Sequence, residues 1–369
     1  MANPNLLQGA HVLAFRIFRV RLLWALILAL ALFRVLTVTQ AVLGALGVAV
    51  ALMVVRWRIR KALAPNFSAV CRVPAPGRTL LAYAGAQRVI RVGDPATGNV
   101  HRMLWGHRGW VNALCAVEID DRTLLASGGN DRTVRLWDPD TGEQVAVLQG
   151  ARAAVVGVCH ARSGGRSLVV GGAQDGTLHV WRPDTGEIVH SLPSGAGEIL
   201  SVCAVESEGR ELFASAHADG TVRLWDPDAG RQVRVLTGHQ GWPNALCPIR
   251  TADGVLLASA GADQTVRLWN PATGEQVRSM RDDFGWLHAL CEVTVDGRPL
   301  LASGGDGPGV KLWDPDTGEH LGTVGGAAHL FGPFGCGWVR TLCQIEVDGV
   351  PRIATGGYDK RVETWHLTT

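Results

Sequence analysis

The pattern of hydrophobic positions divides the chain into two parts. From Leu22 to Val55 nearly every residue is apolar, with interruptions only at Arg34, Gln40 and a few threonines. Beyond residue 64 no helical period is found, and short runs such as "LLASGG" and "TVRLW" alternate in the manner of strands. The intervening "DPDTGE" is typical of turns, because Pro presets φ, Asp caps and Gly accepts positive φ. We therefore expect an apolar N-terminal segment followed by an all-β domain.

The apolar segment predicts a membrane anchor within residues 1–55. As one helix its 34 residues would be roughly 51 Å long, more than a hydrocarbon core of about 30 Å needs. Two topologies remain open: a single span over 35–55, or a hairpin of about 12–33 and 35–55 with Arg34 near the turn, although no Gly, Pro or Asn marks that turn. The segment is too long for the apolar part of a signal peptide.

Charge favours the hairpin. Residues 1–64 contain eight basic side chains and no acidic one. The hairpin places seven of the eight on the cytoplasmic side, as the positive-inside rule prefers, whereas the single span has four on each side. We expect the remainder of the chain, residues 56–369, to lie in the cytoplasm. Residues 65–369 have 33 acidic against 27 basic side chains, which argues against binding to nucleic acid.

A repeat of 44 residues organises the β domain. "VRLWDPDTGE" (134–143) returns at 178–187, 222–231, 266–275 and 310–319, and a copy with Gly93 in the Trp place stands at 90–99. Trp365 follows Trp313 after 52 residues, so the last unit carries an eight-residue insertion. Seven units of four short strands (a to d) predict a seven-bladed β-propeller.

The repeated motifs resemble those of the WD40 family, with a Gly-His near the start of a unit and a Trp-Asp near its end. The resemblance covers about residues 65–369. It implies a seven-bladed propeller that most often serves as a rigid platform for protein partners. The chain ends four residues after Trp365, so the last blade lacks its outer strand, and the resemblance implies that about residues 55–62 supply it. The alternative is that these residues extend the membrane helix and leave a three-stranded blade.

The resemblance also implies a buried, structural His–Ser–Asp–Trp tetrad within a blade. Other blades lack the His, and Asp283 takes that place in the sixth. His179 and His217 are interpreted as lone polar positions without partners. The complete tetrads fall in the second and fifth units, at His107, Ser127, Asp131 and Trp137, and at His239, Ser259, Asp263 and Trp269.

Seven cysteines recur at one position of the innermost strand, which fits small buried core residues rather than disulfides. No His or second Cys stands beside them at ligand spacing, and no catalytic or phosphate-binding motif occurs. We therefore predict no cofactor, no metal and no enzymatic activity. Buried free thiols favour a reducing compartment, in agreement with a cytoplasmic propeller.

Four Gly-Trp pairs stand where strand a begins, on the rim that the d–a and b–c connections form, called here the top face. Blades 3 and 4 have Ala154 and Glu198 instead, so the aromatic side chains form an arc over blades 5, 6, 7 and 2. Trp is enriched at binding hot spots, so we expect a protein or peptide to bind there. The alternatives are that these tryptophans only cover the blade ends, or that a small ligand or ion binds in the central channel. The predicted contact residues are Trp110, Asn112, Trp242, Asn244, Trp286, His288, Phe331, Phe334, Trp338, Arg340 and Tyr358.

Overall fold

The computed structural model describes residues 67–75, 77–119, 122–283, 285–307, 309–325, 339–357 and 362–367. The chain divides into two units, 1–64 and 65–369, and all described residues lie in the second. The predicted anchor (1–55) and the predicted closing strand (55–62) lie outside the described residues. Within the described ranges there is no helix that is long and apolar enough to span a bilayer.

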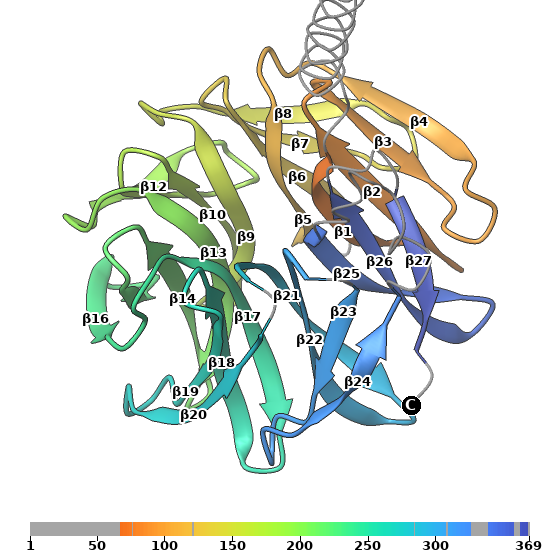
Figure 1. The fold of residues 1–369 in the computed structure, drawn as a ribbon. Helices are drawn as coiled ribbons and strands as arrows, with labels where there is room; N and C mark the ends of the chain where they lie inside the picture. Colours follow the sequence, from red (N-terminus) through yellow and green to blue (C-terminus); the bar gives the residue numbers. More distant parts are fainter. Residues whose placement is uncertain are drawn as a thin grey trace, which may run out of the picture. The chain divides into compact units, whose positions relative to one another are not determined.

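Seven antiparallel sheets make up the second unit (Figure 1), and we number them as blades 1 to 7 in chain order. Six sheets have four strands that pair in sequence order, and the seventh has three strands among the described residues. The innermost strands contact one another in turn, and β25 of blade 7 contacts β1 of blade 1, so the ring is closed. The predicted seven-bladed propeller is thus confirmed.

The strands of blades 1 to 4 are β1 (Phe67–Ala75), β2 (Arg78–Gly85), β3 (Val89–Gly93), β4 (Val100–Trp105), β5 (Val111–Ile119), β6 (Arg122–Gly129), β7 (Val134–Trp137), β8 (Gln144–Leu148), β9 (Val155–Ser163), β10 (Arg166–Ala173), β11 (Thr177–Trp181), β12 (Ile188–Pro193), β13 (Ile199–Ser207), β14 (Arg210–His217), β15 (Val222–Asp226) and β16 (Arg231–Leu236). Those of blades 5 to 7 are β17 (Pro243–Thr251), β18 (Gly254–Gly261), β19 (Thr265–Trp269), β20 (Gln276–Arg281), β21 (Leu287–Val295), β22 (Arg298–Gly305), β23 (Val310–Trp313), β24 (His320–Val324), β25 (Val339–Val347), β26 (Val350–Gly357) and β27 (Val362–His366).

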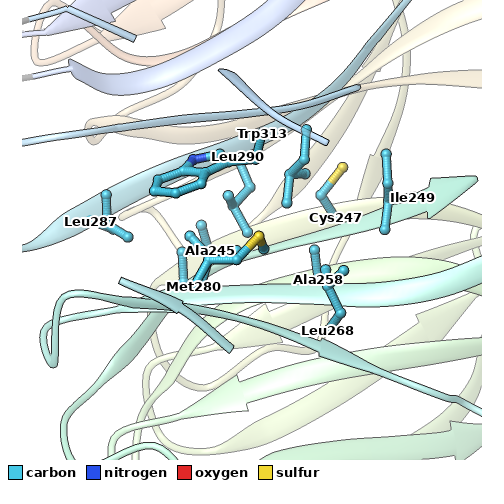
Figure 2. Close-up of a cluster of buried hydrophobic side chains, with 12 residues drawn as sticks. Ala245, Cys247, Ile249, Ala258, Leu268, Met280, Leu287, Leu290 and Trp313 are labelled. Atoms are coloured by element: carbon cyan, nitrogen blue, oxygen red, sulfur yellow. The ribbon is translucent and has the colours of Figure 1, made fainter. Parts of the chain in front are cut away.

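The hydrophobic core lies between the blades. Figure 2 shows the cluster between blades 5 and 6, where Trp313 of blade 6 packs with Leu287, Leu290 and Met280. Trp137, Trp181, Trp225 and Trp269 likewise join clusters that contain residues of the preceding blade. The repeated tryptophan therefore joins each of these blades to the one before it, which is why it recurs once per repeat.

Each innermost strand carries a β-bulge near its start. The register shifts between Val111 and Ala113 in blade 2, and between Pro243 and Ala245 in blade 5. The same irregularity occurs in the other five blades. A bulge leaves one residue out of the ladder and redirects its side chain. The extra residue is the one two positions after the rim tryptophan, so the bulge determines where Asn112 and Asn244 point.

Candidate binding face and the networks that support it

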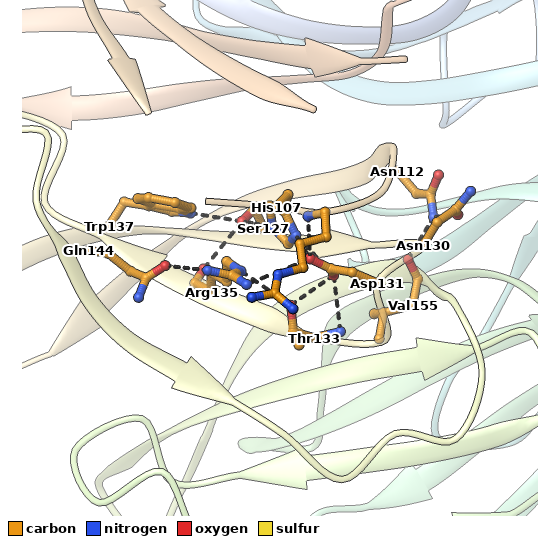
Figure 3. A network of polar contacts seen from close by, with 11 residues as sticks. His107, Asn112, Ser127, Asn130, Asp131, Thr133, Arg135, Trp137, Gln144 and Val155 are labelled. Atoms are coloured by element: carbon orange, nitrogen blue, oxygen red, sulfur yellow. Dashed lines mark hydrogen bonds and ion pairs between the residues drawn. The ribbon is translucent and has the colours of Figure 1, made fainter. Parts of the chain in front are cut away.

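The structure brings the four predicted tetrad residues of blade 2 together (Figure 3). His107 Nδ1 lies 2.9 Å from Asp131 Oδ2, and His107 Nε2 lies 2.7 Å from the Ser127 hydroxyl. The indole N–H of Trp137 donates to the same hydroxyl at 2.8 Å. In blade 5 His239, Ser259, Asp263 and Trp269 repeat these three distances.

The electrostatics of this tetrad fit a structural role. Burial lowers the pKa of His107, so its imidazole is neutral at physiological pH. Burial raises the pKa of Asp131, but the backbone N–H of Arg108 and the side chains of Thr133 and His107 outweigh it, and the net pKa is lowered. Ser127 is fully buried and accepts the Trp137 N–H. No substrate can reach a hydroxyl in this position, although the set resembles a Ser-His-Asp triad in composition.

His179 and His217, interpreted from the sequence as lone polar positions, have partners, so that interpretation was wrong. His217 Nε2 lies 2.7 Å from the Ser215 hydroxyl, which also accepts the Trp225 N–H. His179 Nδ1 lies 3.0 Å from the Ser191 hydroxyl, and its ring stands 5.5 Å from that of Trp181. The repeat spacing gave no sign of either contact, because neither histidine occupies the usual His position.

Blade 4 therefore replaces the missing tetrad His with a histidine from its own strand. In the repeat His217 takes the place of Gly129 in blade 2. A Cβ atom at Gly129 would lie 2.8 Å from His107 Nδ1. In blade 2 the histidine thus leaves no room for a side chain at Gly129, whereas blade 4 has Gly195 at the usual His place and His217 on β14.

Blade 6 has a buried ion pair next to the position that the tetrad histidine occupies in blade 2. Lys311 Nζ lies 2.7 Å from Asp282 Oδ1, and both side chains are nearly inaccessible to solvent. The Trp313 N–H still donates to the Ser303 hydroxyl, at 2.8 Å. The repeat places Asp283 at the His position, but it is the neighbouring Asp282 whose side chain is buried.

Three of the four rim tryptophans lie in the described residues, and all three are about half exposed. Trp110 has an exposed fraction of 51%, Trp242 of 51% and Trp286 of 48%. The rings of Trp242 and Trp286 meet edge to face, with their centroids 6.2 Å apart. The structure thus brings together the tryptophans of blades 5 and 6. The other predicted aromatic residues, Phe331, Phe334, Trp338 and Tyr358, lie outside the described residues.

His288 extends the aromatic pair. Its ring centroid lies 6.5 Å from that of Trp286. Its Nε2 atom lies 3.0 Å from Asp306 Oδ1, and the other carboxylate oxygen accepts the backbone N–H of Trp286 at 3.2 Å. Asp306 therefore holds the backbone of Trp286 and the ring of His288, a role that spacing alone did not reveal.

The predicted contact residues Asn112 and Asn244 bridge neighbouring blades. Asn112 Nδ2 donates to the carbonyl of Val155 in blade 3 at 2.9 Å, and Asn244 Nδ2 donates to the carbonyl of Leu287 in blade 6 at the same distance. Ser68, which was not among the predicted contact residues, makes the equivalent bond to the carbonyl of Val111 at 2.7 Å. These bulge residues hold adjacent blades in register on the top face.

The mouth of the central channel forms a depression of about 600 Å³ on this face. All seven innermost strands contribute to its wall. Among the side chains around it are Trp242, Asn244, Trp286, His288, Arg340 and Glu198. Trp110 does not line it. The structure therefore groups the predicted residues of blades 5, 6 and 7 that it describes, and leaves Trp110 apart.

The seven cysteines of the innermost strands are free thiols. Burial raises the pKa of Cys115 to about 11 and that of Cys203 to about 12. Cys159, Cys203 and Cys247 are buried, and the other four are partly buried. Within the described ranges no three His, Cys, Asp or Glu side chains are grouped so that they could hold a metal ion.

Seven antiparallel sheets in a closed ring, with tryptophan–serine contacts inside several blades, define a repeat protein of the β-propeller class. The family model of the WD domain, G-beta repeat, matches residues 98–138, 142–182, 186–226 and 230–270. These four segments are similar to WD40 repeats, and each spans the outer strand of one blade and the three inner strands of the next. No curated protein was found to match the chain. WD40 propellers are typically interaction scaffolds without enzymatic activity.

Proposed function

We propose that the protein is a non-enzymatic, membrane-tethered scaffold that binds a protein or peptide partner on the top face of its propeller. The observation that carries this proposal is the Trp242–Trp286 pair. Two large rings, each about half exposed and in contact with one another, stand at the edge of a depression. Exposed aromatic surface of this kind is typical of interaction sites.

The surrounding contacts support a rigid binding face. Asp306 holds the backbone of Trp286 and the ring of His288. Asn244 joins the strand that follows Trp242 to blade 6. A face that is already ordered loses little conformational entropy when a partner binds. The site therefore favours a partner that buries both rings at once.

The membrane tether and the cytoplasmic location rest on the sequence. The apolar stretch of residues 22–55 and the basic residues around it support an anchor within residues 1–55, with the propeller on the cytoplasmic side. The free thiols of the propeller agree with a reducing compartment. Protease protection of the propeller in sealed membrane vesicles tests this orientation.

Binding is tested with the double variant Trp242→Ala/Trp286→Ala of the full chain. Proximity labelling in the native cell identifies a partner, whose affinity is then measured with purified proteins. We expect affinity to fall by roughly 100-fold, because two hot-spot tryptophans together contribute several kcal/mol. The matched control is Trp105→Ala on β4, which removes a ring that is 70% exposed but lies outside the arc. Unchanged affinity in a folded double variant refutes the proposed site.

The size of the depression supports a second candidate, a small ligand in the channel mouth. Its volume of about 600 Å³ lies in the range of small-molecule sites, and its wall carries Glu198, His288 and Arg340. Thermal shift of the full chain against a ligand panel tests this candidate. If the thermal shift caused by a ligand persists in Trp242→Ala/Trp286→Ala, the ligand binds in the channel mouth independently of the aromatic arc.

A further inference from the structure

A second depression lies between blades 2 and 3 on the opposite rim, where the a–b and c–d connections are found, called here the bottom face. Its volume is about 850 Å³. The β5–β6 hairpin, the β9–β10 hairpin and the turn after β11 form its wall. Four arginines line it: Arg122, Arg162, Arg166 and Arg182.

Comparison of the repeats shows that two of these arginines replace an ion pair. In blade 2 Arg122 binds Asp138 at 2.8 Å, and in blade 6 the equivalent Arg298 binds Asp314 at 3.1 Å. Blade 4 keeps the same residue types at these positions, Arg210 and Asp226. In blade 3 the same two positions hold Arg166 and Arg182. No other repeat has two basic residues there, so blade 3 alone brings two like charges to this corner of the sheet.

Among the described residues, the ion pairs with neighbouring acids involve Arg162 and Arg182 but not Arg166. Glu118 is bound to Arg162 at 2.6 Å. Arg182 forms a long ion pair with Glu187, at 3.9 Å. Within the described part of the chain, no hydrogen bond or ion pair of the Arg166 guanidinium is found. Asp184 also lines the depression, while Asp120 and Asp121 lie outside the described residues. Two adjacent guanidinium groups of this kind repel each other unless an anion lies between them.

We propose that the depression between blades 2 and 3 binds a phosphate group, with Arg166 and Arg182 as its principal ligands. A phosphate monoester carries close to two negative charges at neutral pH and three acceptor oxygens. Guanidinium groups bind such oxygens in pairs of parallel hydrogen bonds. The phosphate belongs to a soluble phosphomonoester or to a lipid headgroup that carries a phosphomonoester, because both present the same dianionic group. This site is independent of the tryptophan arc on the top face.

The test uses Arg182→Asp, which gives blade 3 the Arg–Asp combination of blades 2, 4 and 6. The variant should fold, with a thermal midpoint equal to or above that of the wild type. Titration calorimetry of the full chain in neutral detergent micelles measures binding of inorganic phosphate and of glycerophosphoinositol 4-phosphate. We expect Arg182→Asp to weaken binding by roughly tenfold or more, since a charge-assisted donor is replaced by a repelling carboxylate. The control is Arg152→Asp, which makes the same change of charge on the d–a connection of blade 3, at the opposite rim.

The source of the phosphate is resolved by a second arm, in which the micelles contain phosphatidylinositol 4-phosphate. Binding of the soluble probes, lost in Arg182→Asp and kept in Arg152→Asp, supports the site with a soluble ligand. Binding of the lipid alone with the same dependence on Arg182 supports a headgroup. Equal binding by the wild type and Arg182→Asp, or no binding of any probe, overturns the proposal and leaves the proposed top-face function untouched.

Discussion

His217 Nε2 lies 2.7 Å from the hydroxyl oxygen of Ser215, the separation that also joins His107 to Ser127 and His239 to Ser259. His107 and His239 come from the connection that precedes strand a, whereas His217 comes from the end of strand b. The buried serine thus keeps its imidazole partner in blade 4 by a different route. The hydrogen bond to the serine, rather than the position of the histidine in the repeat, is the feature that these blades share.

Replacing His217 by Ala should therefore destabilise the propeller. The change removes the imidazole from a fully buried Ser215 and leaves a cavity, and we expect a cost of about 2–4 kcal/mol in the free energy of unfolding. Urea denaturation of wild type and variant measures this difference. His160→Ala is the control, because His160 is only partly buried and its Nε2 atom has a longer contact, 3.2 Å, with Ser167. A variant as stable as the wild type would contradict the assigned role.

The stability that His217 contributes should also depend on pH. Burial, and then the charge of Arg223, lowers its pKa to about 4 from an ordinary 6.5. The folded state thus takes up this proton less readily than the unfolded state, so the contribution is complete above pH 6.5 and declines as the pH falls towards 4. The slope is about 1.4 kcal/mol per pH unit. The free energy of unfolding is measured from pH 7 to pH 4 for the wild type and for His217→Ala. The difference between the two values at each pH isolates the contribution of the His217 proton. Parallel curves would refute the assignment.

The architecture could be predicted from the sequence because the strand pattern, the turn motif and the tryptophan all recur once per repeat. Trp137 and its successors fall at a fixed interval, and each packs against the preceding blade, so one correct strand assignment fixes all the others. The complete tetrads could be located for the same reason. Contacts that break the period could not be found in this way. His217 with Ser215, and Lys311 with Asp282, arise where one blade has lost the common residue and a neighbour in space has replaced it.

The bulge residues illustrate a second limit of sequence reasoning. Asn112 and Asn244 were predicted as partner contacts from their place beside the rim tryptophans. Their amide groups donate to the next blade because the bulge turns them in that direction. The hydrogen bonds of these side chains along the ring could not be predicted from spacing, and their contact with a partner stays a prediction.

Asn244→Leu should weaken the contact between blades 5 and 6. It removes the bond to the Leu287 carbonyl, and we expect a loss of about 1–2 kcal/mol in unfolding free energy. Asn244→Ser is the matched control, since Ser68 makes the equivalent bond in blade 1. The serine variant should retain more stability than the leucine variant in thermal denaturation. The reverse order would show that the side chain at this position does not join the blades.

The ion pair of blade 6 should respond differently to single and double substitution. Lys311→Met leaves Asp282 buried beside an apolar side chain, and we expect a cost of about 3–5 kcal/mol. Asp282→Leu/Lys311→Met removes both charges and should cost clearly less than the single variant. Denaturant unfolding of the two variants and of Asp282→Leu completes a double-mutant cycle. Additive losses would show that the two groups are not coupled.

The thiols of the innermost strands should react slowly while the propeller is folded. Burial raises the pKa of Cys203 to about 12 and that of Cys291 to about 11, so the reactive thiolate is scarce near pH 8. We expect alkylation by iodoacetamide to be at least about 100-fold slower in the native protein than in urea. The measurement uses Cys336→Ser, because Cys336 lies in the insertion outside the innermost strands. Mass spectrometry of the digested protein assigns the label to each cysteine. A native Cys203 that is labelled as fast as in urea would show that the thiol is accessible and that the innermost strands do not protect it.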